Sequence, residues 1–128
     1  MLLTVNDEII YLWDIRGENF DDYICYYRGH KTKINYLIKY NEKIFASCSH
    51  DGIIILWNYN EKVKIIKIKA CNSYISCMIK LNNGNLCSSG NDSSIKIWDT
   101  KSGKCLTVLK GHKKIVKSLC QFRYGVLL

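Results

Sequence analysis

The stretch from Ser88 to Thr100, SSGNDSSIKIWDT, carries the pattern on which the fold of this 128-residue chain depends. It predicts a short strand, a tight polar turn and a second strand that ends in Trp-Asp. The same unit occurs at residues 6–14 (NDEIIYLWD) and 49–58 (SHDGIIILWN). In every copy an Asp precedes the Trp by six residues, and the three tryptophans follow one another at steps of 44 and 41 residues. A period near forty with a turn and a Trp in each copy indicates a repeat architecture.

The repeat extends over whole strands. The second unit holds strand-like runs at 34–39, 44–49, 53–57 and 63–68, separated by polar turns. A shift of 41 residues superimposes the third unit on the second without a gap, whereas the first unit needs a three-residue insertion in its loop at 14–22. We therefore expect an all-β chain with a partial unit over 1–28, complete four-stranded antiparallel units over 29–69 and 70–110, and the start of a further unit over 111–128 that includes a strand at 115–122.

Composition and charge narrow the function classes. No apolar run approaches the roughly 18 residues of a membrane span, so we expect no membrane partner. Seven cysteines form an odd set, and the N-terminal residues lack the basic region of a secretory signal. We therefore expect reduced thiols and a cytoplasmic or nuclear location. The net charge of +8 suggests nucleic acid, but the lysines are scattered, as on a solvated strand face, so a nucleic-acid partner is disfavoured.

The repeated positions resemble the WD-repeat family of β-propellers over essentially the whole chain. The marks are Gly29-His30, Asp51 and Trp57 in one repeat, Asp92 and Trp98-Asp99 in the next, and Gly111-His112 at the start of another. The resemblance implies that each unit is one blade, and that blades stack to bury both of their apolar faces. The expected fold is thus a WD-repeat β-propeller fragment of about three four-stranded blades, open, or closed only with further blades.

The family resemblance also implies a hydrogen-bonded chain of four side chains within a blade. In the middle blade these are His30, Ser49, Asp51 and Trp57. In the third blade Cys71 and Gly90 stand at the histidine and serine positions, and in the first blade Val5 stands at the serine position. We therefore expect one intact set in the middle blade and looser packing in the two outer blades.

Metal-binding and catalytic readings are weaker than structural ones. His30, His50 and His112 together with seven cysteines suggest zinc, but no Cys-x-x-Cys occurs, and the cysteines in strands take positions of small or apolar residues in the other repeats. Asp7, Asp51 and Asp92 occupy equivalent turns, which is a structural pattern, and there is no phosphate loop or nucleophile elbow. We therefore expect no cofactor, no metal and no catalytic site in this chain, so that it is not an enzyme.

A surface for other proteins is the remaining candidate. The resemblance implies a non-catalytic scaffold for protein–protein interaction within a larger assembly, with an RNA-associated scaffold as the alternative. Partners of the family dock on the face that carries the Asp-bearing turns, where lysines would favour an acidic or phosphorylated partner and an aromatic residue would be an anchor. A solvated rim without a dedicated partner is the competing interpretation. The positions on this face are Lys31, Lys33, His50, Asn72, Tyr74, Asn91, Lys113 and Lys114.

Three blades do not close a ring, since propellers contain about 4–8 blades. The sequence leaves three explanations open. The chain is a piece of a longer protein; or two copies exchange the strand at 115–122 and close a six-bladed ring; or the three blades form an open array with exposed edges.

Overall fold

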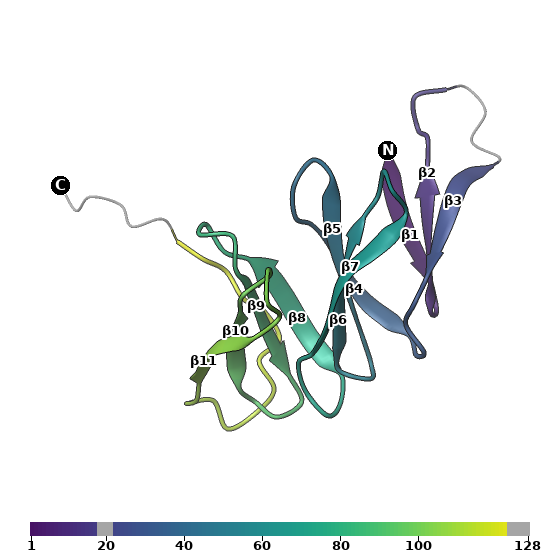
Figure 1. Ribbon diagram of the computed structural model, residues 1–128. Coiled ribbons are helices and arrows are strands. Elements are labelled where there is room, and N and C mark those ends of the chain that lie inside the picture. The colour runs from purple at the N-terminus through teal and green to yellow at the C-terminus, as the bar shows by residue number, and fades with distance from the viewer. Residues whose placement is uncertain (18–21, 123–128) are drawn as a thin grey trace.

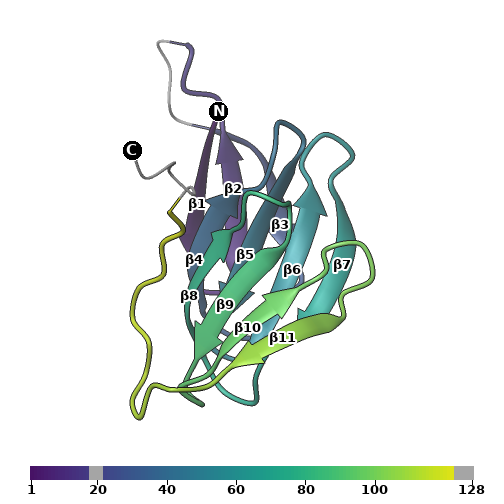
Figure 2. The ribbon, with the colours of Figure 1, turned by 90° about the vertical axis from the view of Figure 1, so that its left-hand side faces the viewer.

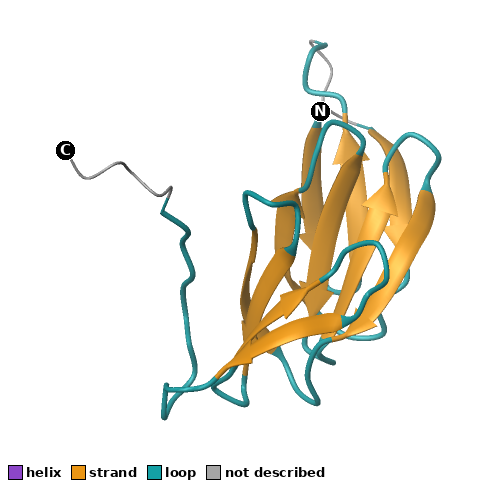
Figure 3. Cartoon of the chain, turned by 60° about the vertical axis from the view of Figure 1, so that its left-hand side comes forward, coloured by secondary structure: helices purple, strands orange, loops and turns teal. Residues whose placement is uncertain are grey.

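The computed structural model describes residues 1–17 and 22–122. Residues 18–21 of the loop at 14–22 and residues 123–128 of the last expected unit lie outside this range. The described part consists of strands and loops (Figure 3), so the expected all-β fold class is confirmed. Within the same range, the structure contains no helix that is long and apolar enough to cross a membrane.

Eleven strands form three antiparallel sheets, each of which follows the chain order of its strands. The sheets lie one after another across Figure 1, from purple through teal to green. The first sheet contains β1 (Leu2–Asn6), β2 (Ile9–Trp13) and β3 (Tyr23–Arg28). The second contains β4 (Ile34–Lys39), β5 (Ile44–Ser49), β6 (Ile53–Asn58) and β7 (Val63–Lys69). The third contains β8 (Ile75–Lys80), β9 (Leu86–Gly90), β10 (Ile95–Trp98) and β11 (Cys105–Leu109).

The strand register repeats from sheet to sheet, including its irregularities. A β-bulge precedes each tryptophan, at Trp13, Trp57 and Trp98, in the pairing with the next strand. A second kind of bulge follows Ile34 in β4 and recurs 41 residues later, after Ile75 in β8. Bulges increase the local twist of a sheet. The repeat found in the sequence is therefore a repeat of strand shape as well as of residue type.

The core lies between the sheets, which are stacked face to face (Figure 2). One cluster joins the first and second sheets, and a second cluster joins the second and third. The strand β6 contributes to both, because Ile55 and Trp57 face the first sheet while Ile54 and Leu56 face the third. This explains why residues 53–57 are apolar at successive positions, since a strand in the middle of the stack is covered on both faces.

The segment 111–122 differs from the expectation of a strand at 115–122, since the described residues of this segment belong to no strand. It nevertheless lies against the third sheet, where the Ser76 and Ser89 hydroxyls donate to the carbonyl oxygen of Val116 at 2.6 and 3.0 Å. In the same way, the Asn35 amide donates to the carbonyl oxygen of Ile75, 41 residues earlier in each case. The segment therefore occupies the place of the next inner strand, but it has no neighbouring strand with which to form a ladder.

Candidate functional site

Each of the three tryptophans donates its indole N–H to a hydroxyl of the neighbouring strand. Trp13 donates to Thr4 at 2.7 Å, and Trp57 donates to Ser47 at 2.8 Å. Trp98 donates to Ser88 at 2.8 Å. A buried indole N–H without a partner would cost about 1–3 kcal/mol, so this pair stabilises every blade. The expectation that the outer blades lack the hydroxyl is therefore wrong.

The middle sheet extends this pair to a histidine. Nε2 of His30 lies 2.7 Å from the Ser47 hydroxyl, which thus connects the imidazole to the indole of Trp57. Ser49, the residue expected in this role, instead donates to the Asp51 carboxylate. The Asp51 carboxylate also accepts the backbone N–H of Ile53 at 3.1 Å, so its bonds hold the turn. The structure thus places Ser47 where the sequence-based assignment has Ser49.

A signal in the sequence could have identified the correct serine. Ser47 and Ser49 point to the same face of β5, since side chains alternate along a strand, and both are fully buried. The shift of 41 residues carries Ser47 to Ser88, which is again a hydroxyl, but it carries Ser49 to Gly90. Only the first position keeps a hydrogen-bonding side chain in both repeats.

Cys71 takes the histidine position of the third sheet without joining the network. Its thiol contacts the carbonyl oxygens of Ser73 at 2.8 Å and Tyr74 at 3.6 Å. Gly90 lies beside it, and a Cβ at that position would lie 2.8 Å from the Cys71 sulfur. The small residue at position 90 therefore makes room for the thiol, and the hydroxyl–indole pair of Ser88 and Trp98 stands alone.

Burial keeps His30 neutral. The side chain is 6% exposed, and Nδ1 has no hydrogen-bond partner among the described residues. Burial lowers the pKa of His30 to about 4, against the raising effect of the Asp51 charge; Lys67 and Lys64 lower the pKa further. Asp51 therefore acts on the imidazole through its charge and not as a hydrogen-bond acceptor. The unfolded chain binds this proton near the ordinary pKa of 6.5, whereas the folded chain binds it only near 4.

The folded state should lose stability as the pH falls through this window. Because the unfolded chain binds more protons than the folded chain between the two pKa values, we expect the unfolding free energy to drop by about 2 kcal/mol from pH 7 to pH 5. Urea unfolding at the two pH values measures the drop. The variant His30→Gln is the control, because the other histidines remain in it. Equal pH dependence in both proteins would contradict the assignment.

A substitution distinguishes the two serines. Ser47→Ala removes a hydroxyl that serves both the indole of Trp57 and the imidazole of His30, so we expect a loss of about 2 kcal/mol in unfolding free energy. Ser88→Ala is the matched variant, because its hydroxyl serves the indole of Trp98 alone, and it should cost about 1 kcal/mol. Equal costs in denaturant titrations would show that the imidazole adds nothing.

The turns that follow β5 and β9 lie at one end of the stacked sheets, and we call this end the turn face. It is built twice by the same backbone contact, because the N–H of His50 donates to Lys33 and the N–H of Asn91 donates to Tyr74. These contacts bring four of the predicted partner-binding positions together in two pairs. The rings of His50 and Tyr74 then connect the pairs, with 5.9 Å between their centroids.

A shallow groove of about 300 Å³ runs across the turn face. Two consecutive sheets and the C-terminal segment line it, since it contains Asn35 and His50, then Tyr74 and Ser76, then Ile115 and Lys117. The tyrosine is half-buried, whereas the predicted lysines and asparagines are exposed. The exposed residues are Lys31, Lys33, Asn72, Asn91, Lys113 and Lys114.

A second groove on the turn face is less open to an anion. It contains Asn72 and Asn91, together with the side chains of Lys69 and Lys96. Lys96 forms an ion pair with Asp92 at 2.6 Å, and Lys69 donates to the carbonyl oxygen of Asp51. These two cations are already bound within the protein. The positive charge available to a partner therefore lies around the first groove, on Lys33 and Lys117.

The cysteines have the surroundings of apolar residues. All seven thiols are free, and burial raises the pKa of Cys48, Cys77 and Cys87. A thiol with a raised pKa is a poor nucleophile and a poor metal ligand at neutral pH. Among residues 1–17 and 22–122, no three side chains of the His, Cys, Asp or Glu type are grouped so that they could hold a metal ion.

The repeat with its hydroxyl–indole pair matches a known family. The profile of the family described as "WD domain, G-beta repeat" matches residues 22–58 and 62–99, which is more than half of the chain. This chain belongs to the WD40 repeat family. The WD40 propeller domain of Doa1 is a similar solved structure, with a TM-score of 0.74 and 25% identity over 86% of this chain and 36% of that one.

Curated WD40 relatives are longer than this chain. The "WD repeat-containing protein 55 homolog" of Dictyostelium discoideum is 28% identical over 93% of this chain and 29% of its own length. The "Pre-mRNA-splicing factor cwf17" of Schizosaccharomyces pombe is 30% identical over 88% of this chain and 33% of its own length. The chain thus spans about a third or less of the length of the curated relatives that it matches.

Proposed function

We propose that this chain is a non-catalytic platform for protein–protein interaction within a larger assembly, and that a partner docks on the turn face. The contact between His50 and Tyr74 carries the proposal, because it fixes an aromatic side chain in a groove shared by successive repeats. Rigid aromatic residues provide much of the binding energy in protein interfaces. A WD40 propeller is in general an interaction scaffold, and its rigid sheets hold such a groove in place.

The chemistry of the groove favours an acidic or phosphorylated peptide. Lys117 lines the groove, and Lys33 is joined to His50 through the backbone at the same end of the sheet. Neither ammonium group has an ion-pair partner within the described part of the chain. Carboxylates and phosphates accept charge-assisted hydrogen bonds from such groups. A location in the cytoplasm or the nucleus is part of this proposal, in keeping with reduced cysteines.

A peptide array tests the proposal directly. The probes are acidic peptides, their phosphorylated forms, and sequence-matched peptides in which each acid is replaced by its amide. We expect binding of the acidic or phosphorylated peptides that is lost in Tyr74→Ala and Lys117→Glu. The variant Lys101→Glu is the charge-matched control, because Lys101 is exposed and lines neither groove of the turn face. Binding that is unchanged by both groove variants would refute the placement of the site.

An RNA-associated scaffold is the second candidate. The net charge of +8 favours it, and the relative in Schizosaccharomyces pombe is described as a pre-mRNA-splicing factor. Titration with a single-stranded RNA oligonucleotide at several salt concentrations separates the two candidates. Steep salt dependence of a tight complex would support RNA, since released counterions set that slope. Absence of binding at low salt would remove this candidate.

A further inference from the structure

The first sheet has a free edge that faces the inner strands of its neighbours. Its order is β1-β2-β3, so β1 pairs with β2 on one side and with no strand of the described residues on the other. In the second and third sheets, the corresponding inner positions are taken by β4 and β8, which contact each other. The free edge of β1 thus lies where a further inner strand would fit.

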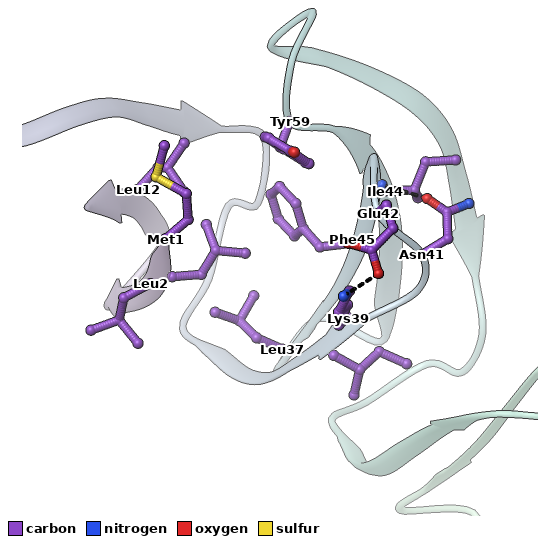
Figure 4. Close-up of a pocket in the computed structure, with 12 residues that line it drawn as sticks. Met1, Leu2, Leu12, Leu37, Lys39, Asn41, Glu42, Ile44, Phe45 and Tyr59 are labelled. Atoms are coloured by element: carbon purple, nitrogen blue, oxygen red, sulfur yellow. Dashed lines mark hydrogen bonds and ion pairs between the residues drawn. The ribbon is translucent and has the colours of Figure 1, made fainter. Parts of the chain in front are cut away.

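An apolar pocket of about 540 Å³ adjoins this free edge (Figure 4). Leu2 and Leu12 of the first sheet face Leu37, Phe45 and Tyr59 of the second across it. Between the second and third sheets, the equivalent space is filled by Tyr40, whose hydroxyl donates to the carbonyl oxygen of Gly84 at 2.5 Å. An empty pocket here and a filled one between the next two sheets show that the first junction lacks its inner side chain.

The chain itself carries a segment that fits both the edge and the pocket. Residues 115–121 already lie in the position of an inner strand beyond the third sheet, but without a ladder partner. Two shifts of 41 residues carry Tyr40 to Leu81 and then to Phe122, whose side chain is 84% exposed. The same shift carries Thr100, the other neighbour of the Tyr40 hydroxyl, back to Tyr59 in the wall of the pocket. Phe122 of another copy would therefore meet Tyr59 there.

The two outward faces of the stack are complementary in the same sense. At the inner junction of the second and third sheets, aliphatic residues of one sheet cover the face that carries Trp98 on the next. The open face of the first sheet carries Trp13 together with Tyr11 and Tyr23, whose rings contact it. The open face of the third sheet is aliphatic and forms a depression lined by Ile79, Ile95, Ile97 and Leu109.

We infer that two copies of this chain associate head to tail, with residues 115–121 of each pairing as the inner strand beside β1 of the other. The pairing completes a four-stranded first sheet in both copies and joins the Trp13 face of each to the aliphatic face of the other. Each copy then contributes three sheets, and two contacts of the same kind close a six-bladed ring, within the range of known propellers. This inference concerns the ends of the stack and does not depend on the turn face.

The third sheet provides the register of the new pair. There, Ile79 lies opposite Cys87, and Met78 lies opposite Ser88. Cys120 is the counterpart of Ile79, and Leu3 precedes Thr4, the counterpart of Ser88 in binding the indole. Cys120 should therefore lie directly opposite Leu3 of the other copy. Opposite residues of an antiparallel pair have Cβ atoms about 4.5–5.5 Å apart, within reach of a disulfide after a small adjustment.

Cysteine cross-linking tests this register on the full chain. The variant Leu3→Cys is oxidised by oxidised glutathione, which accepts the two electrons and two protons released as the S–S bond forms. We expect a covalent dimer with a peptide link between position 3 and Cys120, identified by mass spectrometry. The double variant Leu3→Cys/Cys120→Ser should give no dimer through this position. Val5→Cys, two residues further along β1, should react more slowly, since its diagonal distance to position 120 is larger.

Light scattering supplies the mass without a cross-link. The unmodified chain should have twice the monomer mass of 14.9 kDa. Phe122→Asp should shift the mass to that of a monomer with an unchanged circular dichroism spectrum. Leu106→Asp should remain dimeric, because Leu106 is exposed on β11 outside both proposed contacts. A folded monomer at every concentration, a cross-link at other positions, or a ladder of longer covalent oligomers would overturn the closed pair.

Discussion

Replacement of Trp57 by alanine is expected to lower the free energy of unfolding by about 3–5 kcal/mol. The indole is 2% exposed and packs against the rings of Tyr27 and Phe45, with centroids 5.7 and 6.0 Å away. Its removal leaves a cavity between the first and second sheets and deprives the Ser47 hydroxyl of its donor. Urea unfolding followed by circular dichroism measures the loss at neutral pH.

Trp13→Ala is the matched control for this substitution. Trp13 makes the same kind of bond, to Thr4, but its face is not covered by another sheet of the described chain, and its side chain is only half-buried. We therefore expect a smaller loss than for Trp57. If both substitutions cost the same in an unassociated chain, burial between sheets is not the source of the stability of the tryptophan.

Gly52→Ala should cost about 3 kcal/mol, although it adds only one methyl group. Gly52 has a φ of +75°, which an L-residue adopts only at a cost. A Cβ there would lie 2.1 Å from the carbonyl oxygen of Cys71 and 2.5 Å from that of Ser73, both backbone atoms. The backbone cannot yield easily, because the carbonyl of Gly52 accepts the N–H groups of Ala70 and Cys71. The midpoint of urea unfolding should fall accordingly.

Gly111→Ala is the control, since nothing lies within 4 Å of the added atom and no positive φ is involved. Its effect should remain within about 0.5 kcal/mol. A comparable loss at both positions would mean that alanine acts through the unfolded chain and not through the contact between the second and third sheets. A neutral Gly52→Ala would show that the turn can shift away from residues 71–73.

The sequence predicted the strands and their order well because two local rules determine them. Side chains alternate along a strand, and short polar turns connect neighbouring strands of an antiparallel sheet. The spacing of Asp51 and Trp57 and its repetition at Asp92 and Trp98 located both strands around each turn. The apolar run at 53–57 predicted burial on both faces, and β6 contributes to both core clusters.

The site was predicted less well because it depends on which of two equivalent side chains reaches a partner. Ser47 and Ser49 share one face of β5, and their roles are decided by the pairing register and by the turn at Asp51. The partners of His50 and Tyr74 depend on the distance between sheets, which a residue pattern does not contain. The absence of a strand at 115–122 has a similar cause, since a ladder needs a neighbour and the sequence pattern alone does not provide one.

The one tryptophan in each sheet gives the chain three separate optical reporters. Trp57 and Trp98 are buried between sheets, so their emission should be blue-shifted and resistant to quenching by acrylamide or iodide. Trp13 lies on the open face of the first sheet and should account for the quenchable, red-shifted part of the spectrum. Any protein surface that covers this face would change the emission of a single residue. Spectra of the three Trp→Phe variants would therefore report separately on each junction of the stack.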